Sequence, residues 1–215
     1  MRRMMTRLLL AALAAAMLAP ALTGCSRGPE EEEAKKIVAS LVEASLPLNE
    51  IYYGDGMKVE ENEDGMPAFY ANVADDAPYL TEAELRNATL TVFTKNYAEQ
   101  VIFKTFLEGF SSAGMSGVVY ARYVENGDRL QKRINFDQLI ESGRSRTYDL
   151  EDIEIIRSKK NEIRARLHSY VAGARDLDVE VTVRREEREP GDTDVTESGV
   201  VTSDNFVWRL DSPTY

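Results

Sequence analysis

The chain of 215 residues is poor in the two side chains that most often carry metal binding and catalysis, since it has one cysteine and one histidine. A single cysteine excludes a disulfide within the chain and any paired-cysteine redox or zinc site. A single histidine excludes a histidine-rich metal cluster. The chain also lacks the glycine-rich phosphate-binding patterns and the GxSxG pattern of serine hydrolases. We therefore expect no metal ion and no cofactor, and we expect a protein without catalysis rather than an enzyme.

Positive charge and long apolar runs are scarce as well. Lys and Arg number 26 against 37 Asp and Glu, which gives a net charge of −11. A general nucleic-acid binder needs a basic surface, so we expect no nucleic-acid partner. The longest apolar run is the 14 residues from 8 to 21, short of the ~20 residues of a spanning helix. Overall, 43% hydrophobic and 29% charged residues are typical of a folded domain.

The short apolar run lies in an N-terminal segment with the three parts of a signal peptide. Arg2, Arg3 and Arg7 precede the run, and Leu22-Thr23-Gly24-Cys25 follows it. This segment resembles the signal peptide and lipobox of bacterial lipoproteins. The resemblance implies that residues 1–24 are removed and that Cys25 becomes a lipidated first residue bearing acyl chains such as palmitate. The alternative is a cytosolic protein in which LTGC occurs by chance.

Processing would change both the charge and the chemistry of the chain. Removal of residues 1–24 takes away three arginines and no acid, so 23 basic and 37 acidic residues would remain. The thiol of Cys25 would become a thioether. Two acyl chains give stable anchoring. We therefore expect a chain held by its Cys25 lipid on the extracytoplasmic face of the cell membrane, in the inner or the outer one if the host has two.

The rest of the chain predicts a tether over residues 25–33 and one α+β domain over residues 34–215. A separate helical lobe ending near Gly114 is the alternative. Four glutamates, residues 30–33, would lie in the first turn of a helix that Pro47 ends. Thr81 and Glu84 form a capping-box pattern ahead of a second helix carrying Leu85 and Ala88. A third apolar stripe at helical spacing comprises Tyr97, Val101, Ile102, Phe106 and Phe110.

The second half changes to the alternation of strands. Asn126-Gly127 predicts a hairpin between residues 118–124 and 129–136, with Tyr123 opposite Leu130 and Val119 opposite Ile134. Further strands are expected at 66–73, 150–157, 163–171, 177–184 and 205–210, with loops at 111–117 and 189–198 and a short helix or turn at 137–142. The fold class is therefore α+β, with the N-terminal helices packed on one face of a twisted antiparallel sheet.

The single histidine lies on one of these strands. If the loop between the strands centres on Ala174, the apolar residues of the two strands share one face and His168 faces Glu180. A histidine beside a carboxylate can act as a general base. Opposite charges on paired strands also simply stabilise an exposed sheet face, and we favour that interpretation.

A group of arginines in the same half could bind an anion. If they cluster, they could hold a carboxylate or phosphate of a wall polymer or partner through bidentate contacts. The neighbouring acids make mutual pairing the alternative. The arginines concerned are Arg144, Arg146, Arg157, Arg164, Arg166 and Arg184.

Two further resemblances concern the body of the chain. Residues 81–102 and Tyr52-Tyr53-Gly54 are similar to parts of secreted inhibitors of bacterial wall DL-endopeptidases. The order of helices and then strands, ending in Phe206-Val207-Trp208-Arg209-Leu210, resembles cystatin-like and nuclear-transport-factor-like cones. Such folds host binders, inhibitors and some enzymes, so they do not decide a function.

Three functions follow as hypotheses. The first is an accessory protein that binds a cell-wall enzyme or a wall fragment, through the arginine-bearing sheet face or an exposed Tyr52-Tyr53 turn. The second is a small-molecule binder or enzyme with a pocket between sheet and helices, lined by His168, Tyr170 and Trp208. The third is a structural surface lipoprotein. The candidate binding residues are Arg164, Arg166, His168, Tyr170, Glu180 and Trp208.

Overall fold

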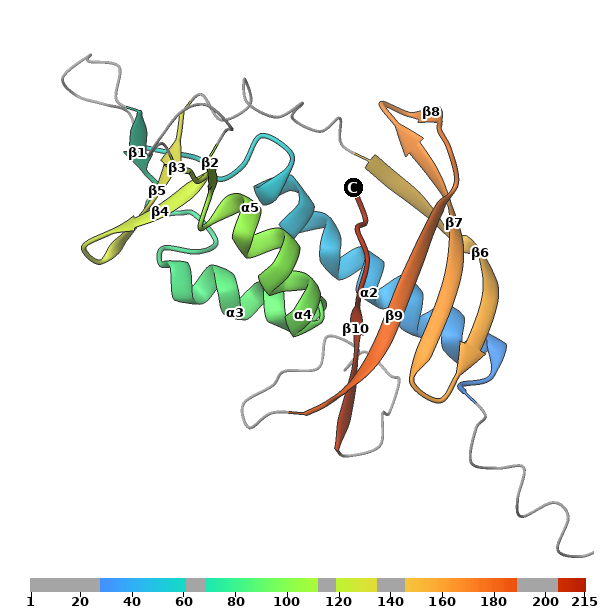
Figure 1. Ribbon diagram of the computed structural model, residues 1–215. Helices are drawn as coiled ribbons and strands as arrows, with labels where there is room; N and C mark the ends of the chain where they lie inside the picture. Colours follow the sequence, from blue (N-terminus) through green and yellow to red (C-terminus); the bar gives the residue numbers. More distant parts are fainter. Residues whose placement is uncertain (1–27, 61–68, 112–118, 135–145, 189–204) are drawn as a thin grey trace, which may run out of the picture.

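The computed structural model describes residues 28–60, 69–111, 119–134, 146–188 and 205–215. The predicted signal peptide, Cys25 and Arg144 lie outside these ranges. So do most of the loop predicted at 111–117, the helix or turn predicted at 137–142 and the loop predicted at 189–198. The described residues form an α+β fold, which confirms the predicted fold class (Figure 1).

The first helix, α2, spans Glu31–Tyr52 and is longer than predicted. The glutamates in its first turn are confirmed, and residues 31–33 of the predicted tether are therefore helical. The prediction that Pro47 ends the helix is wrong, because Pro47 lies inside it. A proline removes one backbone hydrogen bond. The next turn buries Leu48, Ile51 and Tyr52 to at most 6% exposure, and this burial offsets the loss.

A second helix, α3, spans Glu82–Val92 and begins with the predicted capping box. The Thr81 hydroxyl accepts from the Glu84 N–H at 3.2 Å, and the Glu84 carboxylate accepts from the Thr81 N–H at 3.2 Å. The next helical stretch comprises α4 (Lys95–Tyr97), a π-helix (Ala98–Phe103) and α5 (Lys104–Phe106). Ile102 and Phe106 are buried as predicted, but Phe103 is buried in place of the predicted Val101, which is partly exposed. The wider π turn rotates the buried face of the stretch.

The main sheet contains the four strands predicted in the C-terminal third of the chain. They are antiparallel in the order β10-β9-β7-β6, and β8 pairs with the end of β7 (Figure 1). Their bounds are Arg146–Lys159 (β6), Glu162–Val171 (β7), Ala174–Arg175 (β8), Val179–Glu187 (β9) and Phe206–Leu210 (β10).

The predicted hairpin exists but does not join the main sheet. It forms a small sheet in the order β1-β5-β4, from Tyr70–Asn72 (β1), Tyr123–Asn126 (β4) and Arg129–Arg133 (β5). The two-residue strand β2 (Phe110–Ser111) pairs with β3 (Val119–Tyr120). The chain therefore divides its strands among separate sheets, which the run of predicted strands did not indicate.

The predicted register of the hairpin is wrong by two residues. Tyr123 pairs with Lys132, and Leu130 pairs with Glu125. The two-residue loop is Gly127-Asp128, and Gly127 has the positive φ of 69° that a type II′ turn requires there. A shift of two preserves the faces of the strands, so Tyr123 and Leu130 are both fully buried. Val119 pairs with Ser111 rather than with Ile134.

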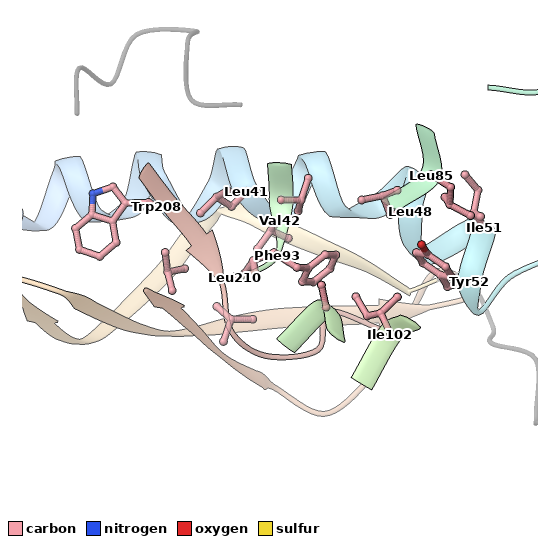
Figure 2. Close-up of a cluster of buried hydrophobic side chains, with 14 of the residues drawn as sticks. Leu41, Val42, Leu48, Ile51, Tyr52, Leu85, Phe93, Ile102, Trp208 and Leu210 are labelled. Carbon is pink, nitrogen blue, oxygen red and sulfur yellow. The ribbon is translucent and has the colours of Figure 1, made fainter. Parts of the chain in front are cut away.

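The core lies between α2 and the inner face of the main sheet (Figure 2). Leu41 and Val42 of α2 lie in it beside Trp208 and Leu210 of β10. The same cluster continues past Phe93 to Ile102 and Tyr52, so one core includes residues of both halves of the chain. None of the helices in the described ranges has the length and apolar character needed to cross a bilayer.

Candidate functional site

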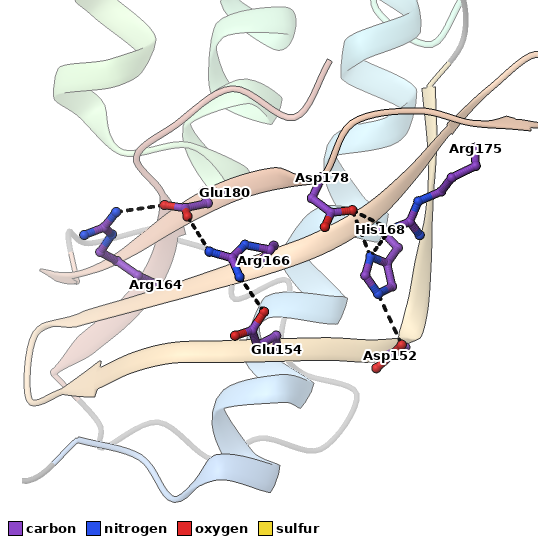
Figure 3. A network of polar contacts seen from close by, with 8 residues as sticks. All are labelled: Asp152, Glu154, Arg164, Arg166, His168, Arg175, Asp178 and Glu180. Carbon is purple, nitrogen blue, oxygen red and sulfur yellow. Dashed lines mark hydrogen bonds and ion pairs between the residues drawn. The ribbon is translucent and has the colours of Figure 1, made fainter.

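The side of the main sheet opposite α2 carries most of the predicted binding residues. β7 alternates strictly, with Ile163, Ala165 and Leu167 fully buried on the inner side. The residues between them point outward (Figure 3). We call this surface the charged outer face and define it by Asp152, Glu154, Arg164, Arg166, His168, Arg175, Asp178 and Glu180.

Two arginines and two glutamates form a chain of ion pairs across three strands of this face. Glu180 accepts from Arg164 at 2.9 Å and from Arg166 at 3.0 Å, and Arg166 also donates to Glu154 at 2.8 Å. The hydrogen bond from Arg166 holds the pKa of Glu180 below its usual value. The same contact raises the pKa of Arg166. Arg166 thus connects β6 and β9 from the strand between them.

The predicted partner of His168 is wrong by two residues, although the predicted faces are confirmed. Arg166, not His168, pairs with Glu180, and Ala165 pairs with Val181 on the buried side. Two features set this register: a shift of one residue between β8 and β9, and a tight turn at Ala172-Gly173, where both residues have positive φ, 51° and 78°. A type I′ turn requires this conformation.

His168 instead links three segments of the chain. Its Nδ1 lies 2.9 Å from Oδ1 of Asp178, and its Nε2 lies 3.3 Å from Oδ2 of Asp152. The hydrogen bond with His168 is the main reason that the pKa of Asp178 is lowered. Arg175 contacts Nδ1 of His168 as well and donates to Asp178 at 2.5 Å. The ring is one-third exposed.

This arrangement suits an electrostatic cross-link better than a general base. Both ring nitrogens of His168 already face carboxylates, so neither is directed at an open site (Figure 3). Ser169, the next residue, lies on the inner side, where its hydroxyl donates to the Leu177 carbonyl at 2.6 Å. Within the described ranges, no three histidine, cysteine or acidic side chains are grouped to hold a metal ion.

Within the described residues, Arg164 and Arg166 share Glu180, and the other arginines of the predicted patch pair with other carboxylates. Arg146 pairs with Asp176 at 2.8 Å, and Arg157 and Arg184 both lie 3.7 Å from Glu162. Arg184 also pairs with Asp211 at 2.5 Å. The arginines are thus paired with carboxylates, which is the alternative that the sequence left open.

The structure does not bring together the three residues of the predicted pocket. Tyr170 lies on the outer side with His168, and its ring centroid is 5.8 Å from the guanidinium carbon of Arg175. Trp208 is 5% exposed and packs in the core on the inner side (Figure 2). The sheet itself therefore separates Trp208 from the other two.

The Tyr52-Tyr53 turn is not the exposed aromatic surface that the sequence suggested. Tyr52 is 1% exposed, and its hydroxyl is 2.8 Å from that of Thr89. Tyr53 is half-buried and stacks on Tyr215, with ring centroids 3.4 Å apart. Burial raises the pKa of both tyrosines. These aromatics hold α2 against α3 and the C-terminal residues.

Sequence reasoning missed the most deeply buried charge among the described residues. Arg122 is 1% exposed, and its guanidinium donates to the carbonyl oxygens of Tyr52 at 2.8 Å and Gly54 at 2.5 Å. It directly precedes the hairpin strand β4 and lies at the end of α2, 70 residues after Tyr52 in the sequence. No local pattern distinguishes it from the exposed arginines.

Comparison with known proteins gives no match: no family model, curated protein or solved structure is significantly similar to the chain. The residues that resemble wall-endopeptidase inhibitors contribute some side chains to the core. Leu85, Ala98 and Ile102 are at most 1% exposed, as is Tyr52. The same stretch exposes Lys95, Asn96, Glu99 and Gln100 on its surface.

Proposed function

We propose that the chain is a lipid-anchored extracytoplasmic protein that binds a partner without catalysis, and that the charged outer face is its binding surface. The observation that carries the proposal is the contrast between the two sides of the main sheet. The inner side is filled by α2 and by core residues such as Trp208. The outer side presents half-exposed arginines and carboxylates, with 37–44% exposure for Arg164, Arg166 and Glu180.

Exposed ion pairs are suited to being exchanged for contacts with a partner. Each contributes only ~0–1 kcal/mol to stability, so replacing it costs little. An arginine fork binds a carboxylate in a bidentate geometry. We therefore propose a cell-wall enzyme or an acidic wall fragment as the partner, held where Arg164 and Arg166 now share Glu180.

The proposed anchor is the lipid on Cys25. The three arginines, the 14-residue apolar run and Leu22-Thr23-Gly24-Cys25 support it. Metabolic labelling with a palmitate analogue tests it directly. We expect label on the wild-type chain and none on Cys25→Ser, which should leave the membrane fraction. An unlabelled wild-type chain would overturn the anchor.

In-cell photocrosslinking tests the binding surface. A photoreactive residue at position 164 should capture one defined protein or wall fragment in intact cells. The same residue at Glu43, exposed on α2, serves as the control and should not. Arg166→Glu should remove the adduct, whereas Lys36→Glu, the same charge change on an exposed position of α2, should preserve it. Equal adducts from positions 164 and 43 would contradict the proposal.

A further inference from the structure

The first described residues are held against the hairpin that joins β6 and β7. Ser158 donates a hydrogen bond from its hydroxyl to the Pro29 carbonyl at 2.7 Å. The backbone of Gly28 lies so close to Lys159 that an added Cβ would stand 2.6 Å from the Lys159 backbone. Figure 1 shows the chain entering α2 beside this hairpin. The position of Gly28 is therefore fixed at the hairpin tip.

The lipid would be only a short distance from that tip. Cys25 precedes Gly28 by three residues, and three residues span at most ~11 Å. The headgroup layer on each side of a bilayer is roughly 6 Å thick. A lipidated Cys25 thus keeps the residue held at the hairpin tip within ~11 Å of the anchored residue, close to the headgroup layer.

We propose that Lys159, Lys160 and Asn161 form a membrane-contact tip, which binds the phosphate groups of the bilayer that holds the anchor. This inference rests on the proposed lipidation of Cys25. All three residues are exposed. The two ammonium groups match headgroup phosphates in charge, and juxtamembrane lysines are attracted to an anionic surface.

The acids nearest to the tip already face basic partners. Glu162 lies 3.7 Å from both Arg157 and Arg184. In the first turn of α2, Glu31 and Glu32 lie 2.9 and 3.5 Å from Lys35. Glu30 and Glu33 lie at the start of the same helix. We expect the two lysines of the tip to be the groups that meet the headgroup phosphates.

The contact would also set the orientation of the domain relative to the membrane. α2 starts beside the tip and has 22 residues, so its other end lies ~33 Å away. That end carries the small sheet, since the Tyr123 hydroxyl donates to the Ile51 carbonyl at 3.0 Å. Two exposed lysines near this distant end provide internal controls. Lys58 follows the end of α2 by six residues, and Lys104 begins α5, whose Phe106 ring packs on Tyr52 with centroids 5.2 Å apart.

Lysine acetylation of the lipidated full chain in vesicles tests the contact. The vesicles contain equal parts phosphatidylglycerol and phosphatidylcholine, and mass spectrometry follows each lysine. We expect Lys159 and Lys160 to react severalfold more slowly than in Cys25→Ser chains mixed with the same vesicles. Lys58 and Lys104 should react equally in both. If the lipidated chain is bound to the vesicles but each of the four lysines reacts as fast as in Cys25→Ser, the contact is overturned and the anchor stands.

A longer tether separates headgroup binding from mere crowding. A flexible Gly-Ser insertion after Ser26 should leave Lys159 and Lys160 protected on anionic vesicles and expose them on pure phosphatidylcholine. Loss of protection on both would overturn headgroup binding. A chain that carries no lipid and stays in solution would instead overturn the proposed anchor, so the two failures are distinguishable.

Discussion

Arg122 donates a hydrogen bond to the carbonyl oxygen of Tyr52, the last residue of α2, with Nη1 2.8 Å from the oxygen. The last carbonyls of a helix lack partners within it, and the helix dipole favours a cation there. α2 has no basic residue in its own last turn. Arg122 supplies that charge from beside β4 and so ties the long helix to the small sheet.

Replacing this cation should destabilise the fold. Arg122→Met removes two charge-assisted hydrogen bonds and leaves two carbonyls buried without them, so we expect a loss of about 3 kcal/mol in the free energy of unfolding. Urea denaturation of the chain lacking residues 1–25 measures it. Arg157→Met, whose side chain is 43% exposed, should cost at most about 0.5 kcal/mol. Similar losses for both variants would contradict the role of Arg122.

The glycine that makes room for Arg122 gives an independent test. Gly56 has φ of 75°, and an added Cβ would stand 2.7 Å from both Arg122 Nη2 and Tyr123 Oη. Gly173 has a similar φ of 78° but open space around it. Gly173→Ala should therefore cost about 1 kcal/mol from the backbone alone, and Gly56→Ala about 2–4 kcal/mol, since it adds overpacking. Equal losses would show that the space beside Gly56 is not filled.

Local patterns predicted the elements of this fold well because each rests on short-range physics. The capping box at Thr81 depends on residues three apart, and the alternation of β7 follows from the pleat alone. Pro47 misled the prediction, because burial beyond it outweighed one missing hydrogen bond. The separation of the strands into two main groups depends on long-range packing, which has no local signature.

The candidate site was predicted on the right surface but with the wrong pairs. Alternation placed Arg164, Arg166 and His168 on one side of β7 correctly. The register depended on a one-residue shift between β8 and β9 and on Ala172 adopting a positive φ, which a non-glycine residue seldom does. Trp208 was assigned to a pocket because an aromatic at a strand's centre fits a core or a binding site equally well. Only the position of α2 distinguishes the two.

The C-terminal residues should contribute to stability through Thr214. Its hydroxyl is 2.8 Å from that of Ser45 and 3.0 Å from the Asn49 amide nitrogen, and all of Thr214 is buried. Thr214→Val keeps the shape but removes these hydrogen bonds, so we expect a loss of about 1–2 kcal/mol by urea denaturation. Thr147→Val, at an exposed position of β6, should change stability by less than about 0.5 kcal/mol. An unchanged midpoint for Thr214→Val would contradict the proposed contact.

Tyr148 should make the protein sensitive to alkali. Burial raises its pKa to about 12 from the ordinary 10.0. The free energy of unfolding is therefore unaffected by this titration below pH 10 and falls as the pH rises from 10 towards 12, because the unfolded chain loses the phenolic proton first. Among the described residues its hydroxyl has no hydrogen-bond partner. Tyr148→Phe should thus stabilise the fold by about 1 kcal/mol at neutral pH.

The alkaline slope provides the matched readout. Between pH 9 and 11.5 the free energy of unfolding should fall less steeply in Tyr148→Phe than in the wild type. The substitution removes one titrating proton, so the slopes should differ by up to about 1.4 kcal/mol per pH unit. Tyr170→Phe, on the outer side, is the control. Identical slopes for wild type and Tyr148→Phe would contradict the burial of the phenol.

The pair of Asp178 with His168 should matter at neutral pH and lose its effect in acid. The hydrogen bond from His168 and the charge of Arg175 lower the pKa of Asp178 below the ordinary 3.8. A lowered carboxyl pKa stabilises the fold above pH 3.8, and this contribution is lost as the pH falls through the folded-state pKa. We expect Asp178→Asn to be less stable than the wild type at pH 7, with the difference shrinking steadily below pH 4 as the wild-type carboxylate is protonated. In a His168→Gln background the same substitution should have a smaller effect, because its main partner is already absent. A difference that stayed constant across this range, or that was equal in both backgrounds, would show that the carboxylate is not held by His168.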